Sequence, residues 1–198
     1  MTQRVPCSRC GELILPDTAA KNAGLCMPCK GGYRERIEEG KRQRQRERQY
    51  EQSAERKYWL DLVHRIFNTP EGFTGLGQPE KTYYAVSCLI GEVYNGGFDQ
   101  FFSNSSGDLY GLALDGLFEL EAEKSAALLV QAKEVLFGDG LVPLDRSKRL
   151  DLMPTVGNDS HPAWDQLDAL DKAFYSDPDQ LSERCKAYAI EHHLYSDS

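Results

Sequence analysis

Four cysteines near the start of the chain have the type and spacing of a metal site. Cys7 and Cys10 form one Cys-x-x-Cys pair, and Cys26 and Cys29 form a second pair, with fifteen residues between Cys10 and Cys26. Two such pairs offer four thiolates, which suit the tetrahedral coordination of Zn²⁺. Four protein ligands leave no open coordination position, so we expect one structural zinc ion. The alternative is that these cysteines are unligated or redox-active.

The residues around the two pairs favour a small module that needs its metal to fold. Gly11 follows the first pair, and Gly31 and Gly32 follow the second, where tight turns around a metal need positive φ angles. A unit of about thirty residues has too little core to fold without the metal. The runs Cys-Gly-Glu-Leu-Ile-Leu-Pro and Gly-Leu-Cys-Met-Pro-Cys make this segment similar to a short zinc ribbon at the N-termini of many bacterial proteins. We therefore predict a zinc-ribbon module over residues 1–32.

No catalytic group is recognisable elsewhere in the sequence. Cys88 and Cys185 lie singly in helical patterns, where a lone cysteine is usually a small core residue. None of the histidines stands beside a nucleophile or a second metal motif; they are His64, His161, His192 and His193. No two carboxylates stand out as an acid and base pair. The sequence therefore predicts a binding protein that is not an enzyme.

The net charge of −8 is divided unequally along the chain. Residues 1–57 carry 13 basic and 8 acidic side chains, whereas residues 58–198 carry 10 and 23. A basic arm can attract nucleic acid, and a strongly acidic domain repels it. There is no apolar run long enough to span a membrane and no apolar segment typical of a signal peptide, so we expect a cytoplasmic protein without membrane contact.

The elements that must position these groups are mostly helical. Residues 33–67 have no proline and favour a long helix, of which residues 33–57 form a charged helical linker. Residues 38–49 contain no apolar side chain, so this part is a solvated arm or a contact for phosphates. Tyr50, Ala54, Tyr58 and Leu62 recur every four residues, so the second half should dock on the main domain.

The rest of the chain reads as an all-α domain, residues 58–198, that folds without zinc. Apolar side chains at helical spacing and flanking Pro and Gly residues mark its helices. The predicted ranges are 79–94, 108–119, 121–137, 146–152, 162–175 and 178–193. The predicted fold class is mainly α: a small zinc ribbon, a long charged helix and an acidic helical domain.

A glycine and phenylalanine motif joins two apolar helices of this domain. It reads Asn-Gly-Gly-Phe-Asp-Gln-Phe-Phe-Ser-Asn over residues 95–104. The motif resembles the hallmark of the C-terminal domain of the bacterial DNA-mimic protein family. That resemblance implies an acidic all-α domain whose carboxylates imitate the phosphates of DNA. The motif residues are Asn95, Gly96, Gly97, Phe98, Gln100, Phe101, Phe102 and Asn104.

The motif itself has a structural and a functional interpretation. As structure, the glycines permit a sharp turn, the phenylalanines fill the core, and the amides satisfy buried backbone groups. As function, the amides line a ligand pocket. We favour the structural interpretation.

Two groups of carboxylates are candidates for binding a partner. Mimicry needs many carboxylates on a rigid scaffold, facing Arg and Lys that otherwise contact DNA. The candidate partner-binding residues are Asp115, Glu119, Glu123, Asp165, Asp168 and Asp171. The expected partner is a basic protein surface, such as a DNA-binding regulator. The alternatives are an immunity-type protein that neutralises a basic toxin, nucleic acid bound directly by the zinc module and basic helix, and a merely solvated acidic face.

Overall fold

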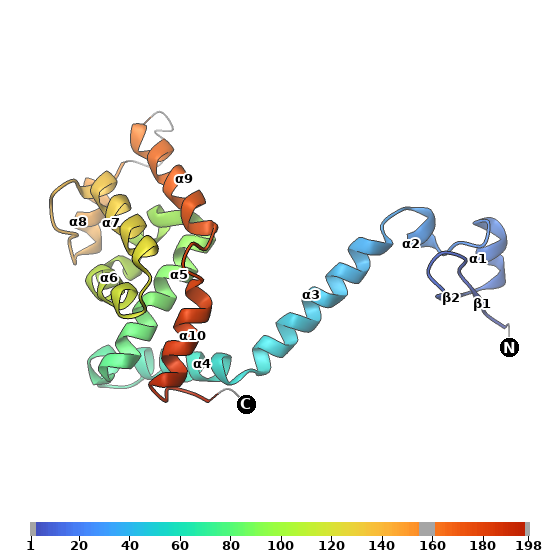
Figure 1. The fold of residues 1–198 in the computed structure, drawn as a ribbon, viewed down its shortest axis with the longest axis horizontal. Helices are drawn as coiled ribbons and strands as arrows, with labels where there is room; N and C mark the ends of the chain where they lie inside the picture. The colour runs from blue at the N-terminus through green and yellow to red at the C-terminus, as the bar shows by residue number, and fades with distance from the viewer. Residues whose placement is uncertain (1–2, 155–160, 197–198) are drawn as a thin grey trace. The chain divides into compact units, whose positions relative to one another are not determined.

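The computed structural model describes residues 3–154 and 161–196, and within them it confirms a mainly helical fold (Figure 1). Contacts divide the chain into two compact units, Met1–Ser53 and Ala54–Ser198, here called the N-terminal and C-terminal units. Each unit has its own apolar core. The sequence predicted module boundaries at residues 32/33 and 57/58. That the chain folds independently on either side of these boundaries stays a prediction.

The N-terminal unit is a small cysteine-rich fold followed by a long helix. Its two short strands pair antiparallel, with Val5 opposite Ile14. Its core is formed by three cysteines and Ile14, with a few partly buried neighbours. Its elements are β1 (Val5–Pro6), β2 (Leu13–Ile14), α1 (Pro16–Lys21), α2 (Met27–Lys30) and α3 (Arg34–Gln52).

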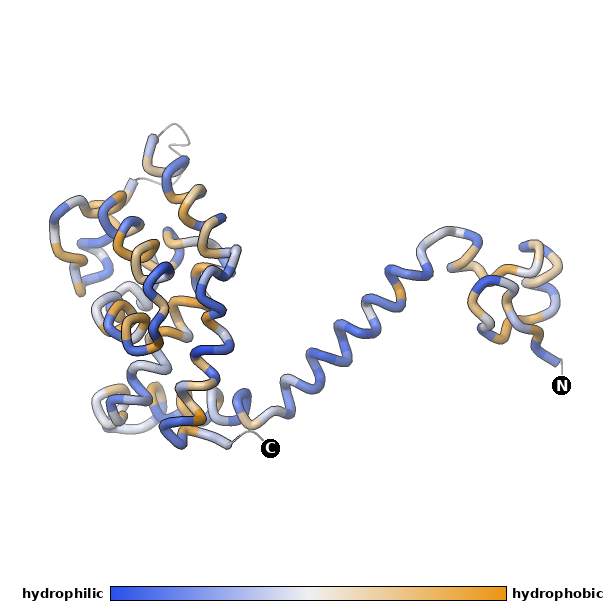
Figure 2. Tube along the Cα trace, in the orientation of Figure 1, coloured by the Kyte–Doolittle hydropathy of each residue, from blue (hydrophilic) through white to orange (hydrophobic). Residues whose placement is uncertain are grey.

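Helix α3 has no buried residue, and its trace is almost wholly hydrophilic (Figure 2). The expectation of one continuous helix over residues 33–67 is wrong, because the chain becomes extended at Ser53, with φ −66° and ψ 157°. Both the Ser53 amide and its hydroxyl donate to the Tyr50 carbonyl, at 2.9 and 2.7 Å. A serine side chain that bonds its local backbone competes with the helical pattern, and here that bond accompanies the end of α3.

The C-terminal unit consists of helices gathered around α5, which contacts α6, α9 and α10 (Figure 1). Within the described residues, no helix is long and apolar enough to cross a bilayer. The elements are α4 (Ala54–Asn68), η1 (Gly72–Gly75), α5 (Gln78–Ser103), η2 (Ser105–Leu109), α6 (Tyr110–Glu119), α7 (Glu123–Phe137), α8 (Arg146–Leu152), α9 (Pro162–Tyr175) and α10 (Leu181–Glu191).

Helix α4 docks on this core, as its apolar stripe predicts. Leu62 is fully buried, and Tyr58 and Trp59 pack against the core from the same helix. Phe67, near the end of α4, does not join this contact, because its side chain is 69% exposed. Tyr50 lies beyond the break at Ser53, in α3, and is also exposed.

Most of the remaining helices lie where the sequence places them, and α8 and α9 have the predicted bounds. Helix α6 starts later than predicted because a 3-10 turn, η2, occupies residues 105–109. Helix α7 begins after Glu121, whose φ of +54° is not helical. The last helix begins after Gln180, which has φ +55°. Positive φ at non-glycine residues gives no clear sequence signal, so these boundaries were missed.

Candidate metal centre and acidic surface

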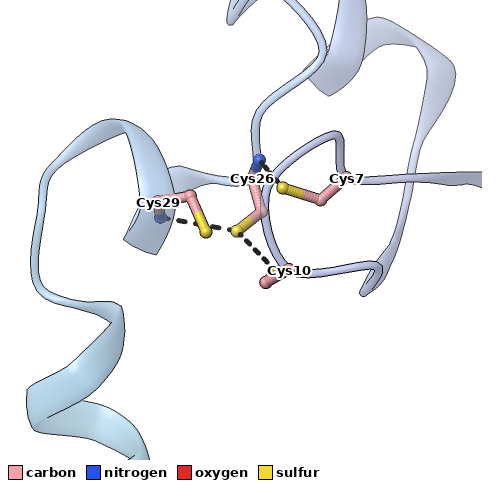
Figure 3. Close-up of side chains that lie close together, drawn as sticks. All are labelled: Cys7, Cys10, Cys26 and Cys29. Atoms are coloured by element: carbon pink, nitrogen blue, oxygen red, sulfur yellow. Dashed lines mark hydrogen bonds between the residues drawn. The ribbon is translucent and has the colours of Figure 1, made fainter.

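The four N-terminal cysteines converge in space from two turns. Cys7 and Cys10 come from the loop between β1 and β2, while Cys26 caps α2 and Cys29 lies within it (Figure 3). The four sulfur atoms all lie within 4.8 Å of one another. Cys7, Cys26 and Cys29 are buried and Cys10 is partly buried. Within the described residues, no other group of His, Cys, Asp and Glu side chains meets the geometry of a metal site.

Backbone amides point at two of the sulfur atoms. The Cys26 amide donates to Cys7 Sγ at 3.2 Å, and the Cys29 amide donates to Cys26 Sγ at 3.4 Å. The bond from Cys26 lowers the pKa of the Cys7 thiol to about 6, because a hydrogen bond stabilises the thiolate. Burial raises the pKa of the Cys29 thiol to about 12. Metal ligation requires the thiolate, so a bound cation would offset the burial that disfavours the Cys29 thiolate.

The donor set fits a tetrahedral zinc ion. Zn–S bonds of about 2.3 Å place tetrahedral sulfur atoms about 3.8 Å apart. Cys10 Sγ and Cys26 Sγ are separated by 3.7 Å. The residues present therefore match the size and chemistry of a four-thiolate site.

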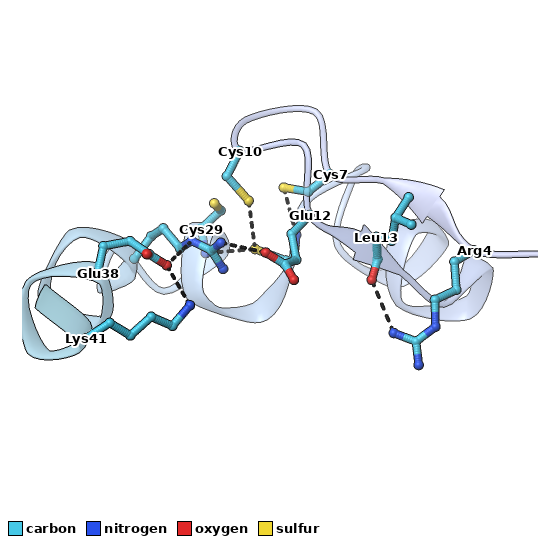
Figure 4. Close-up of polar contacts among 10 residues, drawn as sticks. Arg4, Cys7, Cys10, Glu12, Leu13, Cys29, Glu38 and Lys41 are labelled. Atoms are coloured by element: carbon cyan, nitrogen blue, oxygen red, sulfur yellow. Dashed lines mark hydrogen bonds and ion pairs between the residues drawn. The ribbon is translucent and has the colours of Figure 1, made fainter. Parts of the chain in front are cut away.

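Ion pairs join the cysteine-rich part of the N-terminal unit to the start of α3 (Figure 4). The Arg34 guanidinium contacts Glu12 at 2.8 Å and Glu38 at 3.3 Å. The Glu12 carboxylate raises the pKa of Arg34, and Arg34 in turn lowers the pKa of Glu12. The Tyr33 amide also donates to the Pro28 carbonyl at 3.1 Å. The cysteine turns and α3 thus share polar contacts within one unit.

In the C-terminal unit, the glycine motif makes a kink in α5. The sequence predicted that the helix ends at residue 94. In the structure, Gly96 and Gly97 are not helical, but the helix resumes after them. Gly97 has φ +81° and ψ 179°, which is almost exclusively a glycine conformation. The Phe98 amide, which follows the kink, donates to Asp171 Oδ1 of α9 at 2.8 Å. All three phenylalanines of the motif are fully buried.

Two amides of the motif, together with Ser106, bond to a single carboxylate, that of Glu92. Gln100 Nε2 donates to Glu92 Oε2 at 2.6 Å and Asn104 Nδ2 donates to the same oxygen at 2.9 Å. Ser106 Oγ donates to Glu92 Oε1 at 3.0 Å, and Asn95 Nδ2 donates to Gln100 Oε1 at 3.1 Å. The expectation that these amides satisfy buried backbone groups is therefore wrong. Their partners are side chains, and the motif holds the kink together.

A family model described as DMP19-like protein matches residues 74–193. The chain belongs to the DMP19-like protein family. No curated protein and no solved structure matches it. The match lies within the C-terminal unit and contains the kink of α5. This family is a DNA-mimic family and not an enzyme family, whereas the absence of catalysis in this chain stays a prediction.

A buried arginine in the DMP19-like region was not singled out from the sequence. The Arg149 side chain is fully buried, and its Nε donates to the Phe102 carbonyl at 2.9 Å. Its terminal nitrogens donate to the Asn104 carbonyl at 2.8 Å and to Asp108 Oδ1 at 2.5 Å. Arg149 thus satisfies the carbonyls at the end of α5. Arg149 is the one buried residue of α8, whose leucines are exposed, so the sequence of this helix gives no signal that the arginine points inward.

The six predicted partner-binding carboxylates do not share one role in the DMP19-like region. Asp115, Glu123 and Asp165 are exposed and make no hydrogen bond or ion pair with any described residue. Asp168 is exposed and pairs with Lys172.

Two of the six carboxylates have structural partners. Glu119 accepts from Thr82 Oγ1 and from the Tyr188 hydroxyl, each at 3.1 Å, and so links α6 to α5 and α10. Asp171 accepts from Phe98 at the kink. These two carboxylates are poor candidates for partner contacts, because their oxygens already stabilise the fold.

Proposed function

We propose that the C-terminal unit binds a basic protein surface, such as that of a DNA-binding regulator, by presenting carboxylates in place of DNA phosphates. The observation that carries this proposal is the DMP19-like family match over a unit rich in acid. Residues 54–198 carry 24 acidic and 12 basic side chains, a net charge of −12. Such an excess steers a cationic partner toward the unit and repels nucleic acid.

The favoured contact is the surface where α6 meets α7, formed by Asp115, Phe118 and Glu123 and here called the α6–α7 corner. Both carboxylates are exposed and free of described partners. The Phe118 side chain is 56% exposed beside them in the sequence. Aromatic anchors with a charged rim are typical of protein interfaces. Asp165 and Asp168 of α9, here called the α9 pair, are also exposed, but Asp168 already pairs with Lys172.

Affinity capture tests the proposal. The full chain is immobilised and exposed to a lysate of its source organism at 0.1 M salt, and bound protein is then eluted at 1 M salt. Because the screening length falls from about 10 Å to about 3 Å over this range, we expect release of a basic DNA-binding protein. Recovery of nucleic acid alone, or of no partner, contradicts the proposal.

Two charge-matched variants locate the contact. The first carries Asp115→Lys and Glu123→Lys, and the second carries Asp165→Lys and Asp168→Lys, so both change the net charge equally. We expect the first to weaken binding of the captured partner at least tenfold more than the second. Both must keep the helical circular dichroism and melting temperature of the parent chain. Equal affinity in both folded variants removes the corner as the recognition surface.

We also propose that Zn²⁺ occupies the cysteine site, held by Cys7, Cys10, Cys26 and Cys29, and that it stabilises the N-terminal unit. Elemental analysis of the purified chain should give about one zinc ion per chain. Cys7→Ser and Cys26→Ser should each lower the zinc content and make residues 1–53 sensitive to protease. Cys88→Ser, in the other unit, is the control and should retain the metal. Full zinc occupancy in both N-terminal variants contradicts this assignment.

A further inference from the structure

One segment of α3 is strongly basic and entirely exposed. Residues 41–48 contain five basic side chains and one acidic side chain, a net charge of +4. Every residue from 41 to 52 is exposed. Eight helical residues span about 12 Å, so this charge is concentrated in roughly two turns. We call residues 41–48 the basic segment.

Most cations of the basic segment have no partner in the structure. Arg42, Arg44 and Arg48 form no hydrogen bond or ion pair with any described residue. Lys41 pairs with Glu38 at 3.0 Å, and Arg46 donates to Gln43 at 2.8 Å. Three guanidinium groups are therefore available to an anion. Arg44 and Arg48 lie one turn apart on the same face of the helix.

The composition around the basic segment narrows the kind of anion. Residues 38–49 include no apolar side chain, so the segment offers no anchor for the core of a protein interface and no face to insert into a membrane. A nucleic-acid backbone requires neither, because phosphate contacts are made by charge and hydrogen bonds alone. Arginine is well suited to such contacts through its planar group of donors.

We propose that the basic segment binds the phosphate backbone of double-stranded nucleic acid. The negative charge of a four-thiolate metal site does not cancel this attraction. Arg34, next to that site, precedes Arg44 by ten residues, or about 15 Å of helix. That distance exceeds the screening length of about 10 Å at 0.1 M salt. The chain then has a basic region that contacts nucleic acid and an acidic region that does not.

Fluorescence anisotropy of the full, metal-loaded chain with a labelled 20-base-pair duplex tests this inference. We expect weak binding at 50 mM salt that falls steeply toward 200 mM. A variant with Arg42→Gln, Arg44→Gln and Arg48→Gln loses up to three phosphate contacts. Its slope of log affinity against log salt should be shallower than that of the parent chain by up to about 2.7. Between 50 and 200 mM salt, the parent chain should therefore lose up to about 40-fold more affinity than the variant does.

The control removes three cations from the C-terminal unit, through Lys57→Gln, Lys124→Gln and Lys148→Gln. Its net charge equals that of the arginine variant, and its binding should stay close to that of the parent chain. An equal loss in both variants shows a diffuse effect of net charge and overturns the inference. An absence of duplex binding at 50 mM salt also overturns the inference. Binding of poly-glutamate as tight as that of the duplex overturns it too, because the basic segment would then be a site for an acidic protein.

Discussion

At the kink of α5, one carboxylate supplies an acceptor that the helix itself lacks. The Phe98 amide starts the second half of the helix, where backbone N–H groups have no acceptor within the same helix. Asp171 Oδ1 accepts this amide from a residue 73 positions away. The Asp171 side chain is only partly exposed, and burial raises its pKa despite the bond from Phe98. Position 171 thus needs an acceptor oxygen more than it needs a charge.

Replacing this carboxylate should separate the two properties. We expect Asp171→Ala to destabilise the C-terminal unit by about 1–3 kcal/mol, because the Phe98 amide loses its acceptor. Asp171→Asn retains an acceptor oxygen and should cost clearly less. Thermal or urea unfolding of the full chain, followed by circular dichroism, measures the difference. Equal losses from both substitutions would mean that the charge, and not the hydrogen bond, is what matters.

Comparison of the parent chain with the Asp171→Asn variant also tests a prediction for the effect of pH on stability. Because the pKa of Asp171 is raised in the folded state, the folded chain binds this proton more readily than the unfolded chain does. The contribution of Asp171 to stability therefore rises as pH falls through the raised pKa toward the unfolded value of about 3.9. Asp171→Asn should remove that contribution from the pH profile of unfolding.

At the scale of elements, α5 owes its shape to glycine at one position. A Cβ atom on Gly97 would collide with the Asp171 carboxylate, and the φ of +81° already disfavours any side chain. Gly91 lies in the same helix, but a Cβ atom there has no neighbour within 4 Å. The two glycines therefore differ in whether the fold requires them.

This difference predicts opposite effects of alanine. Gly97→Ala should destabilise the C-terminal unit by at least about 1–3 kcal/mol from backbone strain, with the contact to Asp171 adding to it. Gly91→Ala should stabilise the same unit by about 0.4–1 kcal/mol, since alanine favours helix and reduces the entropy of the unfolded chain. Chemical unfolding of the two variants provides the comparison. A neutral Gly97→Ala would show that the kink is not required.

At the scale of the whole molecule, the sequence predicted local features better than long-range ones. The cysteine spacing identified a cluster of four sulfur atoms, and helical periodicity placed α8 and α9 with correct bounds. Composition favoured a helix that continued through Ser53, where α3 in fact ends. The break was missed because a serine without a neighbouring proline or glycine is a weak signal for a helix end.

The roles of Glu92, Arg149 and Asp171 depended on partners that only the fold brings near. Arg149 reaches a carbonyl 47 residues away, and nothing in its local pattern indicates a buried charge. For the same reason Glu119 and Asp171 were grouped with Asp115, Glu123 and Asp165, which have no described partner. Local acidity is visible in a sequence, but the long-range hydrogen bond that occupies a carboxylate is not.

The central position of α5 has a consequence for the order in which a ribosome delivers the chain. Ser87 of α5 contacts Cys185 of α10, 98 residues later, and Phe98 packs on Phe174. A nascent chain that stops before α9 leaves these faces of α5 uncovered. The four cysteines, by contrast, are all translated within 23 residues. We therefore expect the cysteine-rich part to fold early in translation, while the apolar side chains of α5 stay accessible to chaperones until the last helices have been made.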